Sequence, residues 1–179
     1  MSKVDRLISN YEDFARLPWQ DHLSGVEKVW FAIYEPSDER RLRRRVGEFE
    51  NATGRAGHGW AFCELTDAFA EWMSSQEYRD AYFESPDKLQ LALSDFREWV
   101  AQKVIHALES DKVDDNTIVA VCGAASLFGF MRVSQLLDDV SLHVRGRLLV
   151  FFPGAYEGNT FRLLDARDGW NYHAVPITA

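Results

Sequence analysis

The sequence predicts one α/β domain of three layers, a mostly parallel, doubly wound sheet with helices on both faces and an irregular C-terminal β addition. Three observations support this prediction. Continuous apolar runs recur at 29–34, 60–65, 117–122 and 147–152, as in strands buried on both faces. Segments with helical spacing of apolar residues lie between them. This alternation of strand and helix is typical of parallel sheets.

A chain of 179 residues is the size of a single domain, large enough to bury about two thirds of its unfolded surface. We expect a helix and connector over residues 1–24 and the core over residues 25–179. The apolar positions of the first helix recur at helical spacing across residues 3–16 and give it one buried face.

The first strand, 29–34, leads into a second helix. Ser37 is placed to cap that helix, and acids follow in its first turn, so we expect a helix over about 38–52. The strand 60–65 is followed in the same way by Thr66 and Asp67, which start the next helix. Ser85 and Pro86 mark the start of the longest helix, which runs to about residue 109.

The C-terminal half adds a helix at about 130–141 before the apolar strand 147–152, which we expect to stop at Pro153 and Gly154. Gly158 and Asn159 indicate a turn. Two further strands are predicted at 161–164 and 170–177, and Pro176 restricts the second of them to an edge or a strand end.

The composition limits the classes of partner. The formal net charge of −8 repels nucleic acid globally and favours partners with basic surfaces.

Cys63 and Cys122 lie in apolar surroundings, as buried thiols do, which favours the cytoplasm. The N-terminal residues carry charges throughout, unlike a signal peptide. The longest uncharged run, 116–131, is shorter than the roughly 20 apolar residues that span a bilayer. No membrane association is therefore expected.

The second helix carries five arginines, at positions 40, 41, 43, 44 and 45. A basic patch of this kind can bind phosphate, DNA or an acidic partner. We therefore keep as an alternative function a DNA-contacting role, in which DNA contact would use the side chains of Arg40, Arg41, Arg44 and Arg45. The simpler interpretation is a solvated helix face neutralised by the neighbouring acids Asp38, Glu39, Glu48 and Glu50.

Ligands of open α/β sheets bind beyond the carboxyl ends of the strands, so any pocket is expected there. The loop GAASLFG, residues 123–129, resembles a phosphate loop but lacks the lysine, so tight packing is its simpler role. A second alternative function is a cryptic metal-dependent hydrolase. Its candidate ligands are Asp38, Asp67, Asp165 and Asp168 with His58 or His173. Their spacing matches no metal motif, so we predict no catalytic residue, cofactor or metal.

The stretch 147–177 is the part most crowded with large and charged side chains. Because these residues have no catalytic spacing, we interpret them as a docking surface in which Trp170 is an interface anchor. The predicted partner-binding residues are Tyr156, Arg162, Asp165, Asp168, Trp170 and Tyr172.

Six blocks occur in one order across residues 25–178: ERRLRRRVGEFE, AGHGWAF, LTDAFAEWM, EYRDAYFE, GAASLFGFMRVS and GRLLVFFPGAYEGNTFRLLDARDGWNYHAVPI. Together they resemble the BrxB family of bacterial BREX systems, which mark host DNA and stop phage replication. The resemblance implies a cytoplasmic accessory protein. Its implied partners are a PglX-like methyltransferase, a PglZ-like alkaline-phosphatase-like protein and a BrxC-like AAA-type ATPase. No catalytic motif transfers, so we expect a non-enzymatic adaptor that docks on a partner, with any DNA contact indirect.

Overall fold

Four apolar runs of the chain form the parallel strands of the structure, a computed structural model that describes residues 1–166 and 169–179. They are β1 (Val29–Tyr34), β2 (Gly59–Glu64), β3 (Thr117–Cys122) and β4 (Arg147–Glu157). Every residue of β1 and of β3 is buried, because helices cover both faces of these strands. The predicted bounds of β1 and β3 are confirmed residue for residue.

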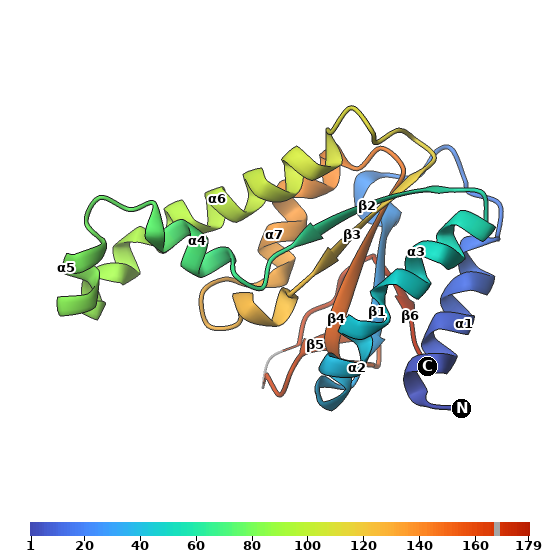
Figure 1. Cartoon of the computed structure of the whole chain (residues 1–179), viewed down its shortest axis with the longest axis horizontal. Coiled ribbons are helices and arrows are strands. Elements are labelled where there is room, and N and C mark those ends of the chain that lie inside the picture. Colours follow the sequence, from blue (N-terminus) through green and yellow to red (C-terminus); the bar gives the residue numbers. More distant parts are fainter. Residues whose placement is uncertain (167–168) are drawn as a thin grey trace.

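The sheet has the strand order β2-β3-β4-β1-β6, where β6 is Val175–Ile177 (Figure 1). From β1 the chain crosses to the far edge at β2 and then returns through β3 to β4, which lies beside β1. All pairings in this order are parallel. The mostly parallel, doubly wound sheet is therefore confirmed.

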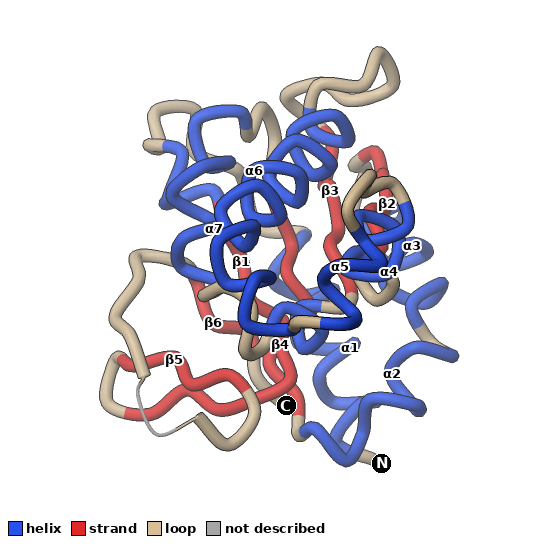
Figure 2. Tube along the Cα trace, turned by 90° about the vertical axis from the view of Figure 1, so that its left-hand side faces the viewer, coloured by secondary structure: helices blue, strands red, loops and turns tan. Residues whose placement is uncertain are grey.

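Helices cover the two faces of the sheet, as Figure 2 shows. One face carries α1 (Lys3–Ala15), α2 (Glu39–Arg44) and α3 (Val46–Arg55). The other carries α4 (Ala68–Ser74), α5 (Arg79–Glu84), α6 (Leu89–Leu108) and α7 (Val133–Val140). Alternate residues of β1 face the two cores: Phe31 lies in the core under α6 and α7, and Ala32 in the core under α1 and α3. The three predicted layers are confirmed.

The prediction of a single helix over 38–52 is wrong. The helix is interrupted at Arg45, which separates α2 from α3. Arg45 has φ −115° and ψ 10°, outside the helical region, and its guanidinium pairs with Asp5 of α1. The predicted cap is also wrong: Ser37 lies inside a 3-10 turn, Pro36–Asp38, and its side chain makes no capping hydrogen bond.

The longest helix, α6, is preceded by a 3-10 turn, Pro86–Lys88, and Ser85 makes no side-chain capping bond there. In Figure 1, α5 and the amino-terminal end of α6 project to the left of the sheet. No residue of α5 is buried.

The strand β4 does not stop at Pro153, which corrects the sequence prediction. Its backbone continues to Glu157 and pairs antiparallel with β5 (Thr160–Leu163). Pro153 has no N–H group, but its carbonyl accepts a hydrogen bond from the N–H of Leu164 at 2.8 Å. The turn between β4 and β5 has positive φ at Gly158 and Asn159, 55° and 63°, as a tight hairpin turn requires. This predicted turn is confirmed.

The last predicted strand, 170–177, is shorter in the structure. Only Val175–Ile177 forms β6, which pairs with β1 at the sheet edge that Pro176 was expected to occupy. Trp170 instead forms an isolated antiparallel bridge with Phe161. The C-terminal β addition is therefore the hairpin β4–β5 with the Trp170 bridge beside it. Within the described residues no helix is long and apolar enough to cross a membrane.

Candidate functional site

The carboxyl ends of the parallel strands meet at one edge of the sheet, where ligands of this fold class bind. A cavity of about 280 Å³ lies there. Its lining comes from α2, from the residues after β2 and β3, and from β4, and includes Glu39, Arg43, Thr66, Ser126 and Pro153. The sequence predicted that any pocket would lie at this edge. The structure has a small cavity there, but larger ones lie elsewhere, between α6 and α7 and beside Trp170.

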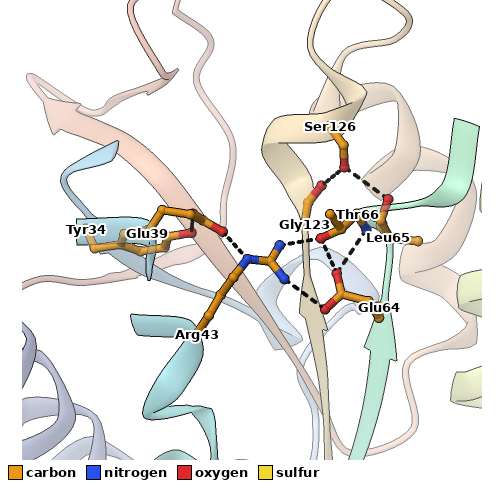
Figure 3. Close-up of polar contacts among 8 residues, drawn as sticks. All are labelled: Tyr34, Glu39, Arg43, Glu64, Leu65, Thr66, Gly123 and Ser126. Carbon is orange, nitrogen blue, oxygen red and sulfur yellow. Dashed lines mark hydrogen bonds and ion pairs between the residues drawn. The ribbon is translucent and has the colours of Figure 1, made fainter. Parts of the chain in front are cut away.

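Arg43 is the centre of this site, as Figure 3 shows. Its Nε donates to Glu39 at 2.7 Å, its Nη1 donates to Glu64 of β2 at 3.2 Å, and its Nη2 donates to the hydroxyl of Thr66. One arginine therefore joins α2 to the carboxyl end of β2. We call Glu39, Arg43, Glu64 and Thr66 the arginine clamp.

Two groups of this site have shifted pKa values, Tyr34 beside the clamp and Glu64 within it. Burial raises the pKa of the Tyr34 hydroxyl well above its usual value, and the adjacent Glu39, to which that hydroxyl donates, raises it further. Burial opposes ionisation of Glu64, but hydrogen bonds from Thr66 and the charge of Arg43 hold the pKa of its carboxyl below the usual value. The site thus places a neutral Tyr34 close to the ion pair of Arg43 and Glu64.

The loop after β3 packs tightly against the residue that follows β2. Gly123 has φ +89°, and the Ser126 hydroxyl donates to the carbonyl of Leu65 at 3.0 Å and to that of Gly123 (Figure 3). The Ser126 proton is therefore directed at backbone carbonyls rather than at a base. Since Arg43 already binds two carboxylates, an incoming phosphate would have to displace them. The geometry favours tight packing over phosphate binding.

Replacing Arg43 by Met is expected to lower the free energy of unfolding by about 1–2 kcal/mol, since Glu39 and Glu64 would lose their shared counter-charge at a partly exposed site. The matched control is Arg44→Met on the same helix. Arg44 is exposed and pairs with no described carboxylate, so its loss should change stability by less than about 0.5 kcal/mol. Urea unfolding of both variants measures the difference, and equal effects would contradict a clamp at Arg43.

Of the four predicted DNA-contacting arginines, two form ion pairs with described residues and two do not. Arg41 pairs with Asp38 at 3.2 Å, and Arg45 pairs with Glu48 at 2.6 Å and with Asp5. Hydrogen bonds from Ser2, with a further one from Arg45, hold the pKa of Asp5 far below its usual value. Arg40 and Arg44 are exposed and have no ion pair with a described residue. Two of the expected neutralising acids, Asp38 and Glu48, pair with these arginines, and a third, Glu39, pairs with Arg43. This neutralisation favours the solvated-face interpretation.

The described residues considered for a metal site do not converge, and Asp168 lies outside the described part of the chain. His58 lies before β2, at the amino end of the sheet, where it stacks on Trp19 at 3.9 Å and bonds to Asn116 at 2.6 Å. Asp67 follows β2 at the opposite end of the strand. Within residues 1–166 and 169–179, no three His, Cys, Asp or Glu side chains form a group that could hold a metal ion.

The predicted docking residues fall into two sets, and Asp168 lies outside the described residues. Arg162 and Asp165 are exposed. Tyr156, Trp170 and Tyr172 are half-buried and pack against the core. Burial raises the pKa of Tyr172 to about 12. Among the described docking residues, Arg162 and Asp165 are therefore fully accessible to another molecule, and the three aromatic side chains are accessible in part.

The sequence did not predict the groove beside Trp170. It has a volume of about 470 Å³ and lies between the C-terminal addition and the loop that leads into α7. We call it the aromatic groove, and its apolar lining includes Phe128, Phe130, Met131, Leu163 and Trp170. Phe128 is 47% exposed although it is large and apolar. The available signal was the pair of large aromatic residues, Phe128 and Phe130, at the end of the loop 123–129 and the start of the predicted helix.

Comparison with known proteins gives one match. A family model described as BREX protein BrxB matches residues 62–177, more than half of the chain. The match begins within β2 and ends with β6, so it includes the aromatic groove and Glu64 but not α2 with its arginines. No curated protein and no solved structure matches the chain.

Proposed function

Because the chain belongs to the BrxB family, and is therefore a component of a BREX phage-defence system, we propose that it acts there as a non-enzymatic adaptor. The adaptor binds another BREX protein through the aromatic groove and through Arg162 and Asp165, two exposed residues of the C-terminal addition. The PglZ-like protein or the BrxC-like ATPase is the partner that we expect.

The observation that supports this proposal most strongly is the aromatic groove itself. Phe128 is half-exposed beside Trp170, while Phe130 is anchored by stacking on Phe69 at 4.2 Å. Exposed aromatic side chains on a rigid support are frequent anchors of protein interfaces, because they bury a large area at a low cost in conformational entropy. Arg162 and Asp165 on the same C-terminal addition supply the polar residues that typically surround such an anchor.

The proposal is tested by co-purification of the chain with each BREX component in turn. Phe128→Ser and, separately, Trp170→Ser should weaken capture of the partner at least about tenfold, the usual effect of losing an aromatic anchor. The control is Leu142→Ser, which removes a side chain that is 88% exposed in a turn before β4. It should leave capture unchanged.

Circular dichroism of each variant separates loss of binding from loss of fold. The adaptor proposal is wrong if the unmodified chain captures none of the BREX components. It is also wrong at this surface if Phe128→Ser and Leu142→Ser capture the partner equally well.

A further inference from the structure

The strand β2 is an edge strand with an unpaired side. The N–H groups of Gly59 and Leu65 donate across to β3, to Asn116 at 3.0 Å and to Cys122 at 2.9 Å. Backbone groups alternate in direction along a strand, so those of Trp60, Phe62 and Glu64 point away from β3. Among the described residues, β2 pairs with β3 alone. Three residues therefore present N–H and C=O groups at an open edge.

This edge lacks the usual protection against strand pairing. Edge strands are commonly protected by charges, prolines or bulges, and the opposite edge strand, β6, contains Pro176. The sequence of β2 is GWAFCE, with no proline and one charge, and that charge, Glu64, is held by Arg43. Phe62, at the middle of the open side, is 44% exposed. The strand is apolar, regular and able to accept another strand.

We propose that β2 pairs antiparallel with β2 of a second copy of this chain. In an antiparallel pair, residues that exchange hydrogen bonds lie directly opposite each other. The register that uses all three outward residues sets Phe62 opposite Phe62 of the second copy, with each Trp60 opposite a Glu64. This register has a two-fold axis at Phe62, as a closed dimer requires. The strand is therefore complementary to itself, and the sheet continues across the dimer.

Two energetic terms act on this dimer. Pairing brings the two Phe62 rings together on the face of the sheet that carries α2 and α3, and cross-strand aromatic pairs stabilise such contacts. The net charge of −8 on each copy opposes association. Because salt screens that repulsion, the dimer should become tighter as ionic strength rises. The surface differs from the aromatic groove, so the dimer does not depend on the adaptor role.

Size-exclusion chromatography with light scattering over a range of protein and salt concentrations tests the proposal. We expect the mass to approach twice the 20.6 kDa of one chain. Phe62→Lys places like charges opposite each other and should weaken dimerisation about tenfold or more. The control, Leu91→Lys, replaces a side chain that is 87% exposed on the projecting end of α6 and should leave the dimer intact.

Phe62→Cys tests the register without a disruptive charge. Opposite Cα atoms of a hydrogen-bonded antiparallel pair are about 5.5 Å apart, which a disulfide can span. Mild oxidation should therefore link two chains of Phe62→Cys, and should not link two chains of Leu91→Cys. A mass of one chain at every concentration overturns the proposal. So does equal cross-linking of the two cysteine variants, or equal loss of dimer in the two lysine variants.

Discussion

Replacing Gly123 by Ala is expected to lower the free energy of unfolding by about 3–5 kcal/mol. Gly123 has φ +89°, and a Cβ atom there would overlap the backbone nitrogen of Thr66 and approach the Glu64 carboxylate to 2.8 Å. The strained backbone contributes about 1–2 kcal/mol of the loss. The overlap contributes the rest, since the end of β2 would have to move away from β3 and break the arginine clamp.

Gly129→Ala is the matched control. Gly129 lies in the same loop with φ +86°, but a Cβ atom at this position would have no described neighbour within 4 Å. The free energy of unfolding of this variant should fall only by the cost of the strained backbone, about 1–2 kcal/mol. Guanidinium unfolding gives the free energy of unfolding of both variants, and the difference between the two values is the cost of the steric overlap at Gly123. Equal losses would mean that the contact between Gly123 and Thr66 does not limit this loop.

Phe161→Ala should destabilise the protein by about 3–5 kcal/mol, the usual cost of removing a buried phenylalanine. Phe161 is fully buried, and its ring lies 4.6 Å from Phe31 of β1 and 4.6 Å from Tyr156 of β4. Its backbone also exchanges two hydrogen bonds with Trp170, at 2.8 and 2.9 Å. The ring therefore attaches the C-terminal addition to the parallel sheet.

Because Trp170 is positioned through Phe161, the same variant should also lose the partner capture that we propose for the aromatic groove. The control is Arg162→Ala, at the next position of β5, where the side chain is exposed. Its stability should change by less than about 0.5 kcal/mol, while its capture of the partner falls. Thermal unfolding and co-purification measure the two effects. A stable Phe161→Ala variant would contradict the role of this ring as the attachment.

The parallel strands were predictable because a strand covered on both faces has to be apolar throughout. The bounds of β1 and β3 follow from their composition alone. The turn at Gly158 and Asn159 was predictable for a related reason, since these residue types tolerate the positive φ that the hairpin needs. Local chemistry was sufficient in both cases.

The helix at 38–52 shows where local chemistry was insufficient. Its sequence is helical throughout, but the break at Arg45 coincides with an ion pair to Asp5, forty residues earlier in the chain. Arg43 was equally hard to distinguish from the four arginines around it, because its partner Glu64 lies on strand β2 and not on the same helix. Neither partner could be identified from spacing along the chain.

The sequence by itself determined the α/β class, the layers and the family of this protein, because apolar periodicity, turn residues and ordered sequence blocks are local properties. Tertiary structure alone decided which arginine forms the clamp, that β4 continues beyond Pro153, and that Phe62 and Phe128 stay exposed. The physical reason is that exposure and pairing depend on which distant segments pack nearby. An apolar residue has the same sequence signature whether a neighbour covers it or not.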